Sequence, residues 1–315
     1  MELIRTKTRF DFVCLRSQII AFSLSGLLTL LSIVSMLVQG LHLGIDFSGG
    51  TLVQVRFVKP PHMDQIRNAL AQLELGDVVI QEFGAPEEIL IRVAKQPSGS
   101  DAQSALAARV VETVKPLAGE GGVELRRVEF VGPQVGSELI MNGLMAVFYS
   151  MIAILVYIAW RFEWRFAYGA ILSLVHDVII TMGLFSVTQK EFTLVVLAAV
   201  LTIIGYSIND TIVVFDRIRE ERVRSKKSTM AAVINQAIND TLSRTIIVSL
   251  TVVLVLIALL FFGGLVIHDF ALALLCGVVL GTYSSIFVAS QIVLVLDRKE
   301  PTEAEKLPTT EAESP

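Results

Sequence analysis

Six long apolar runs dominate the hydrophobic pattern of the chain. Each run is long enough to cross a hydrocarbon core, which needs about 20 helical residues. Because the runs are continuously apolar rather than alternating, they predict membrane-spanning helices and not the strands of a membrane barrel. The predicted spans are 17–38, 139–160, 166–188, 192–215, 241–262 and 270–296.

Between the first two spans, residues 39–138 have the pattern of a small soluble domain. Alternating stretches predict strands and stretches of helical spacing predict helices, in the order βαββαβ. This order is typical of a ferredoxin-like fold with both helices on one face of the sheet. In a domain of about 80 residues, we expect the other sheet face to be open to a partner. The predicted strands are 51–58, 77–83, 88–94 and 123–131, and the predicted helices are 63–73 and 102–117.

The first apolar run could be a cleaved signal peptide or an uncleaved anchor. Its apolar length exceeds the 7–15 residues of a signal core, and Val38-Gln39-Gly40 is a poor cleavage site, so the pattern favours an anchor.

Basic residues in the short loops predict the orientation of the chain. Arg161 and Arg165 lie between the second and third spans, and six basic residues lie within 217–227, whereas the opposite short loops hold only Lys190. We therefore expect a multi-pass membrane protein with both termini cytoplasmic and 39–138 on the far side of the membrane. The remaining segments are predicted to be a cytoplasmic N-terminus (1–16), a basic loop with an amphipathic helix (216–240) and a disordered tail (297–315).

Composition narrows the class of protein further. Hydrophobic residues make up 53% of the 315 residues and charged residues only 18%, against about 25% in soluble domains, which excludes a cytosolic globule or a disordered chain. The net charge is −4, and no segment forms a broad basic face, so nucleic acid is not an expected partner.

Three ionisable residues inside the predicted spans are the main functional candidates, because a charge near the bilayer centre costs about 2.5–3.5 kcal/mol. Asp177 is about 16 Å deep, near the midplane. Asp210 and Arg244 each lie within about 8 Å of the same membrane surface, on spans that run in opposite directions. Their matching depths predict an ion pair that protonation could break. The equally weighted alternative is that Arg244 reaches the interface and Asp210 merely neutralises it.

Polar neighbours extend these sites. On the fourth span, Thr202, Tyr206, Ser207 and Asn209 accompany Asp210 and are predicted to support a proton pathway. His176 could relay protons to its neighbour Asp177, but adjacent helix residues point about 100° apart, so a packing role is favoured. A serine-protease interpretation of Gly205-Tyr206-Ser207 with His176 or His268 is disfavoured, because His268 is expected on the opposite side of the membrane and such glycine and serine pairs are common in packed helices. Neither enzymatic activity, a cofactor nor a metal site is expected.

Four stretches carry a resemblance to the SecF family of bacterial protein-export subunits. They are GIDFSGG at 44–50, FEWRFA at 162–167, HDV at 176–178 and GYSINDTIVVFDRIRE at 205–220. Read physically, Gly49 and Gly50 permit a tight turn into the first strand, and Asp46 is predicted to cap that turn.

The resemblance implies a function and a set of partners. It implies a heterodimer with SecD that forms a twelve-span unit of the RND superfamily beside the SecYEG channel, with YajC and YidC as further candidates. Such a unit uses the proton motive force to promote preprotein translocation and release on the periplasmic side. The family's intramembrane aspartate and arginine fall on Asp210 and Arg244.

Protonation of Asp210 is hypothesised to swing the soluble domain through the connections at 40–44 and 132–136. Two alternatives from other classes stay open: a non-conducting assembly subunit of the translocon, and half of an RND-type small-molecule exporter. The second alternative would need a larger extramembrane domain with an apolar cleft.

Overall fold

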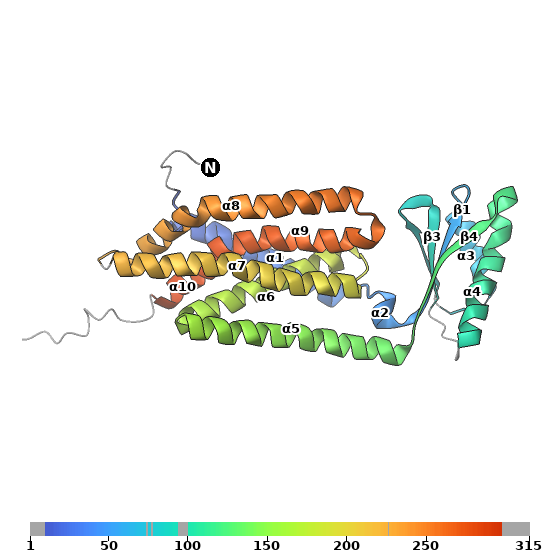
Figure 1. Ribbon diagram of the computed structural model, residues 1–315, viewed down its shortest axis with the longest axis horizontal. Coiled ribbons are helices and arrows are strands. Elements are labelled where there is room, and N and C mark those ends of the chain that lie inside the picture. The colour runs from blue at the N-terminus through green and yellow to red at the C-terminus, as the bar shows by residue number, and fades with distance from the viewer. Residues whose placement is uncertain (1–9, 74, 77, 94–99, 226, 298–315) are drawn as a thin grey trace, which may run out of the picture.

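The computed structural model describes residues 10–73, 75–76, 78–93, 100–225 and 227–297. It has two parts, an elongated bundle of helices and a small domain at one end of that bundle (Figure 1). Most of the N-terminal segment and the whole of 298–315, predicted to be a disordered tail, lie outside the described residues.

Within the described residues, six helical segments are long and apolar enough to cross a membrane. The predicted fold class, a six-span helical membrane protein with a small α+β domain, is confirmed. The spans are α1 (Leu15–Val38), α5 (Pro133–Arg161), α6 (Trp164–Thr188), α7 (Leu194–Arg224), α8 (Met230–Phe262) and a composite of α9 (Leu265–Ser284), the π-helical η2 (Ser285–Ala289) and α10 (Ser290–Asp297).

Helix α5 begins before its predicted span, at Pro133, and α7 and α8 extend still further beyond the apolar pattern. Helix α7 continues to Arg224, and α8 already begins at Met230, so the predicted amphipathic helix is the first part of α8. The extension of α7 is mostly polar and that of α8 is amphipathic, and an ion pair joins them: Arg217 Nη2 lies 2.6 Å from Asp240 Oδ2. Helical structure therefore continues beyond the apolar run because charged side chains on the two helices pair with each other.

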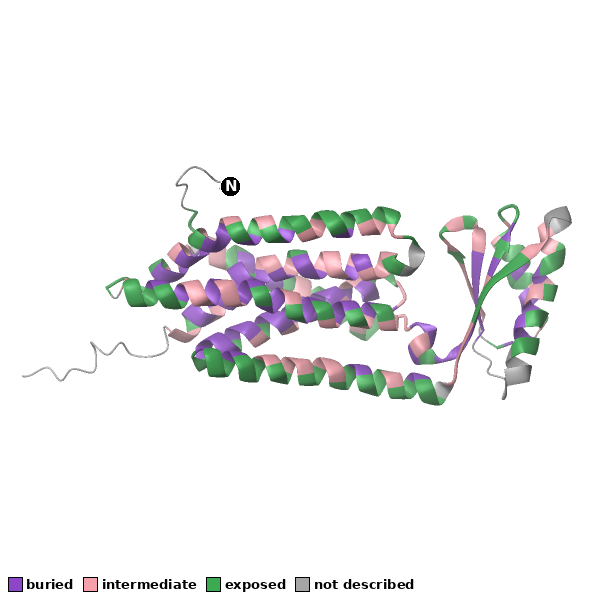
Figure 2. Cartoon of the chain, viewed as in Figure 1, coloured by how far each residue is buried: buried purple, intermediate pink, exposed green. Residues whose placement is uncertain are grey.

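The helices differ in how much of their surface the bundle covers. Helices α6 and α7 and the last span are the most buried, whereas α5 is exposed along most of its length (Figure 2). Its exposed residues are large and apolar, for example Leu144, Phe148 and Val156. Such a surface requires lipid or another apolar helix around it.

The soluble domain has the predicted ferredoxin-like arrangement. Its four strands form one antiparallel sheet in the order β2-β3-β1-β4, the order of a split βαβ fold. The inward-facing positions Val53, Val55, Ile89 and Ile91 pack against the two helices. The elements are β1 (Gly50–Phe57), α3 (Met63–Ala71), β2 (Val78–Phe83), β3 (Ala85–Val93), α4 (Ser100–Val114), the 3₁₀ helix η1 (Lys115–Gly121) and β4 (Val123–Val131).

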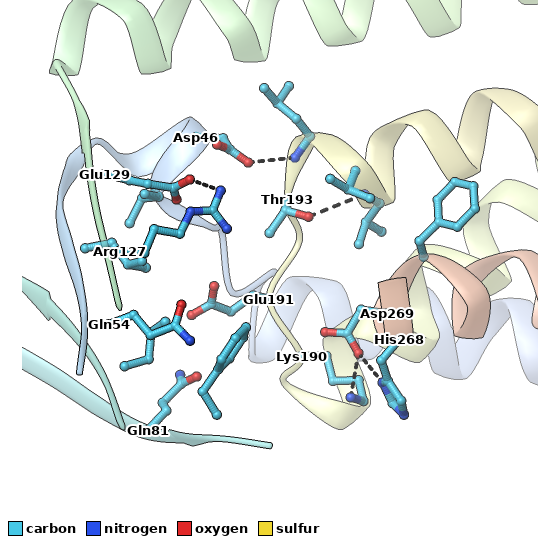
Figure 3. Close-up of a pocket in the computed structure, with 18 of the residues that line it drawn as sticks. Asp46, Gln54, Gln81, Arg127, Glu129, Lys190, Glu191, Thr193, His268 and Asp269 are labelled. Carbon is cyan, nitrogen blue, oxygen red and sulfur yellow. Dashed lines mark hydrogen bonds and ion pairs between the residues drawn. The ribbon is translucent and has the colours of Figure 1, made fainter. Parts of the chain in front are cut away.

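The second face of the sheet looks toward the bundle. A short helix that the sequence pattern did not predict, α2 (Ile45–Ser48), covers part of it, and Ile45 packs there with Leu52 and Leu90. The rest of this face lines a cavity of about 620 Å³ together with the adjacent ends of α7 and α9 (Figure 3). The face expected to be open is therefore partly closed by the chain itself.

Candidate functional site

The carboxylate of Asp210 lies inside the bundle, where α7 meets α8 and α9. The residue is only 4% exposed. Ser249 of α8 donates a hydrogen bond of 3.4 Å to its Oδ2, and the Ser249 hydroxyl lies 2.7 Å from that of Thr282 on α9. The Tyr206 hydroxyl is also buried beside Ser249. Asp210 is thus surrounded by neutral hydroxyl groups contributed by its own helix and two neighbours.

Arg244 does not form the predicted contact with Asp210. Its side chain is exposed, and among the described residues no ion pair within 4.0 Å joins the two. The reason is the rotation of α8: Thr245 and Ser249 face the bundle, and residue 244 is displaced from Thr245 by about 100°. The prediction rested on matching depth, and depth carries no information on the rotation of a helix about its axis.

Asp177 forms a second buried carboxylate site at the centre of the bundle. It is completely buried, and its Oδ2 accepts hydrogen bonds of 2.7 Å from both Ser207 on α7 and Ser284 on α9. Ser173, one turn earlier on α6, donates to the Ser284 hydroxyl at 2.9 Å. The Asp177 carboxylate is therefore held in place by hydroxyl groups from two neighbouring helices.

The ring of His176 contacts its sequence neighbour. Its Nδ1 lies 2.9 Å from Asp177 Oδ1, whereas Nε2 is buried without a hydrogen-bond partner. The packing role favoured from helical spacing does not account for this contact. The Cα–Cβ bonds of His176 and Asp177 point in different directions, but rotation of the two side chains brings the imidazole and the carboxylate into contact. Whether Nδ1 donates or accepts in this contact depends on the tautomer of the ring.

Close packing of α9 against α7 brings these hydroxyls to Asp177. A Cβ atom at Gly281 would lie 3.0 Å from the Ser207 Cβ, and one at Gly277 would lie 2.3 Å from Ile203 Cγ1. Small residues four apart let two membrane helices approach closely. The π-helical segment follows immediately after Ser284, and such segments are frequent at functional sites.

Substituting Leu for Gly277 should therefore destabilise the bundle by about 1–3 kcal/mol or more, because the new side chain must displace Ile203. The measurement is the thermal unfolding midpoint of the purified protein in detergent. Gly26→Leu is the matched control, since nothing lies within 4 Å of a Cβ at that position. Equal midpoints for the two variants would contradict the close α7–α9 contact.

The other predicted supporting residues divide into two groups. Ser207 and Tyr206 belong to the carboxylate sites described above. Thr202 and Asn209 instead lie on the exposed face of α7, and the Thr202 hydroxyl donates to Ala198 of its own helix at 2.8 Å. The structure of this chain alone therefore does not bring these two residues to Asp210.

The sequence analysis did not single out three side chains of the candidate site, namely Ser249, Thr282 and Ser284. Each lies in an apolar helix and belongs to a hydroxyl cluster around one of the carboxylates. Serine and threonine are common in membrane helices, where many bond to their own backbone. These residues lie at the same depth in the bundle as Asp210 and Asp177. That match could have identified them from the sequence only if it had been known which helices pack against each other.

The GIDFSGG stretch connects the two parts of the molecule. Gly49 and Gly50 have φ values of 70° and 127°, conformations that glycine adopts readily, as the turn prediction required. Asp46 was predicted to cap this turn, but the hydrogen bond that its side chain makes joins it to another element: its Oδ2 accepts a 2.9 Å bond from the backbone N–H of Leu194 at the start of α7 (Figure 3). A carboxylate is favourable there because the N-terminus of a helix carries partial positive charge.

Within the described part of the chain, no group of three or more His, Cys, Asp or Glu side chains is arranged to hold a metal ion. The side chains grouped around Asp210 and Asp177 are hydroxyls, carboxylates and one imidazole. These groups can bind and transfer protons.

Six spans, buried intramembrane carboxylates and a ferredoxin-like domain inserted after the first span define a multi-pass membrane transport protein. Residues 111–299 match the family described as "Protein export membrane protein SecD/SecF, C-terminal", and residues 34–61 match "SecD/SecF GG Motif". The chain belongs to the SecF family and is a subunit of the Sec protein-export machinery, as the sequence resemblance predicted.

Individual relatives agree over nearly the whole chain. The protein translocase subunit SecF of Magnetococcus marinus is 58% identical over 297 residues, which cover 94% of this chain and 95% of that protein. SecF of Vibrio alginolyticus is 46% identical over 277 residues, covering 88% and 87%. The crystal structure of SecDF from Thermus thermophilus superposes with a TM-score of 0.83 at 36% identity, covering 95% of this chain but only 40% of the SecDF chain.

Proposed function

We propose that this chain pairs with a SecD subunit to form a proton-driven unit that promotes preprotein translocation and release at the SecYEG channel. The observation that carries the proposal is the burial of two carboxylates, Asp210 and Asp177, on neighbouring helices of one bundle. Support for the pairing comes from the match to SecDF, because this chain covers only 40% of the SecDF chain. The remaining part of SecDF would correspond to the SecD subunit. YajC and YidC are proposed as further partners.

The unit is proposed to lie in the bacterial inner membrane with both termini cytoplasmic and the soluble domain periplasmic. Support comes from the charge distribution at the two ends of the bundle. Arg161 pairs with Asp216 and Arg222 with Glu163 at the end away from the domain. The short connections at the domain end carry Lys190 alone among Lys and Arg. This asymmetry is the one expected from the positive-inside rule.

The proposed chemistry is reversible protonation of Asp210. When ionised, the carboxylate is attracted by Arg244 and accepts the Ser249 hydrogen bond; when protonated, it loses the first attraction and can itself donate. A proton moving down 100 mV releases about 2.3 kcal/mol, and each pH unit adds about 1.4 kcal/mol. A few protons therefore provide enough free energy to shift a two-state equilibrium.

Asp177 is proposed to take part through α7. Ser207, which donates to Asp177, lies one turn before Asp210 on this helix. Any rotation or shift of α7 that follows protonation of Asp210 therefore alters the hydrogen bonding of Asp177 as well. This linkage provides a route by which the two carboxylates change protonation in a coordinated order.

The SecD half is proposed to contact the exposed face of α7. This face consists of small and polar residues, including Ala198, Thr202, Gly205 and Asn209, which are poorly suited to lipid. Small residues are typical of helix–helix contacts in membranes, and polar residues can hydrogen-bond across them. In this arrangement Thr202 and Asn209 would support the proton pathway from the partner side.

The proposal is tested by reconstituting this chain with SecD in liposomes and imposing a pH gradient. Proton uptake should depend on both subunits. Gradient-dependent export should appear when SecYEG and the ATP-driven pump are added. A non-conducting assembly subunit would instead give normal copurification with SecD and SecYEG but no proton flux.

Arg244→Lys should lower proton flux several-fold without weakening the fold, because lysine keeps the charge but loses the planar, forked donor group. Arg244 is exposed on this chain, so the substitution disturbs no buried packing within it. The measurement is proton flux in the reconstituted pair, with copurification of SecD as the assembly control. Flux equal to that of the wild type would mean that Arg244 acts only as a neutralising charge.

A further inference from the structure

The loop between α6 and α7 is paired with the chain that enters the soluble domain. Phe192 N donates to His42 O at 2.8 Å, and Gly44 N donates to Phe192 O at 2.9 Å, so the two segments form a short parallel bridge. The Phe192 ring stacks on Phe47 of α2, with centroids 5.9 Å apart. The start of α7 is therefore attached to the domain by backbone hydrogen bonds and by an aromatic contact.

A buried ion pair attaches the same loop to the sheet. Arg92 of β3 is 9% exposed, and its Nη2 lies 2.7 Å from Oε1 of Glu191. Its Nη1 donates to Leu43 O at 3.2 Å. Because Nη2 is not aligned for a hydrogen bond, the contact with Glu191 is chiefly electrostatic. Removing one partner would leave a buried charge without compensation, so the pair resists separation.

The connections through which a domain swing was hypothesised are also held in place. The segment 40–44 contains the bridge to Phe192. The segment 132–136 packs closely against α2, because a Cβ at Gly136 would lie 2.5 Å from the carbonyl oxygen of Phe47. Neither connection is an extended, unpaired linker. A hinge at these two points would have to break the contacts that join the domain to α7.

We propose that Asp46, Arg92 and Glu191 form a latch that makes the soluble domain and α7 move as one body. Asp46 holds the N-terminus of α7 (Figure 3), as its hydrogen bond with Leu194 shows. The Arg92–Glu191 pair holds the loop that precedes this helix. Asp210 lies 16 residues beyond Leu194 on the same helix, about 24 Å away. A helix carries displacement over this distance, so protonation of Asp210 reaches the domain through the latch. The inference rests on the proposed function.

Reversing the charge of Glu191 tests whether movement of α7 reaches the soluble domain, without altering the residues proposed to bind protons. Glu191→Arg places two cations in contact at the latch and leaves the carboxylates of the bundle untouched. In liposomes holding this chain, SecD and SecYEG, we expect gradient-dependent export to fall at least about fivefold while proton flux stays within about twofold of the wild type. The exchanged pair Arg92→Glu/Glu191→Arg should recover a substantial part of the export.

Two outcomes would overturn the latch: unchanged export in Glu191→Arg, or equal losses of export and proton flux that the exchanged pair does not repair. The second outcome would indicate a merely structural ion pair. A wild-type complex without any proton flux would instead contradict the proposed function. In that case the latch is tested independently, by a cross-link between the domain connection and the start of α7.

The cross-link is a disulfide between Gly44→Cys and Thr193→Cys, with Cys14 and Cys276 replaced by Ser. A Cβ at Gly44 would lie 2.9 Å from Thr193 Cγ2 and 3.4 Å from its Cα, within reach of disulfide geometry. If the domain and α7 move together, oxidation should leave export within about twofold of the reduced protein. Loss of export on oxidation, reversed by reductant, would show that they separate and would overturn the latch. Each single Cys variant serves as the control.

Discussion

Replacing Asp210 by Asn should abolish the part of protein export that depends on the ion gradient. Asn has nearly the same shape and can still accept the Ser249 hydrogen bond, but it cannot gain or lose a proton. Since each proton supplies at least about 2 kcal/mol at ordinary gradients, the loss should be about tenfold or more. The measurement is the rate of preprotein translocation into inverted membrane vesicles, with and without a gradient.

The control for this variant is Asp64→Asn, which makes the same chemical change at an exposed position on α3. Export without a gradient should be equal in Asp210→Asn, Asp64→Asn and the wild type, because the ATP-driven step does not use this carboxylate. Gradient stimulation that persists in Asp210→Asn would remove Asp210 from the mechanism.

Replacing Asp177 by Asn should have the second largest effect. The wild-type Oδ2 accepts two serine hydrogen bonds, and the Oδ1 contacts His176. An amide can neither gain nor lose a proton, and its NH₂ group cannot accept the hydrogen bonds that the replaced oxygen accepts, so proton flux should fall about tenfold and the stability of the bundle by about 1–3 kcal/mol. The measurements are proton flux in reconstituted liposomes and the thermal midpoint in detergent.

Ser284→Ala separates the two effects at this site. It removes one of the two donors to Oδ2 and keeps the carboxylate, so its loss of flux should be smaller than that of Asp177→Asn. If the two variants lose stability equally and neither loses flux, Asp177 has a packing role only.

The hydrophobic pattern was sufficient to predict the six spans and the ferredoxin-like domain. Continuous apolar runs and alternating strands are determined by local sequence, and the sheet order follows from the βαββαβ order. The extents of α7 and α8 were underestimated because their polar ends are stabilised by contacts between helices, such as Arg217 with Asp240. The length of an apolar run gives no information about ion pairs between helices.

The candidate site was predictable only in part, for a related reason. A carboxylate within a membrane helix stands out in any sequence, which identified Asp177 and Asp210. Helix rotation and pairing are properties of the packed bundle, and they decide that Ser249 rather than Arg244 touches Asp210. The role of Asp46 at the start of α7 likewise depends on a contact between residues 148 positions apart.

The central claim is that the protonation state of Asp210 sets the shape of the bundle. It is tested most directly by measuring the distance between spin labels at the exposed ends of α1 and α8, at Val38→Cys and Phe262→Cys, in the complex with SecD. Cys14 and Cys276 are replaced by Ser, and the pH is varied from about 8 to about 5, across the range in which a buried carboxyl group can titrate.

The account predicts two distance populations whose ratio changes with pH in the wild-type background. Asp210→Asn should hold the low-pH ratio at every pH, because an amide imitates the protonated carboxyl group. An Asp210→Asn protein that follows the same pH dependence as the wild type would contradict the claim.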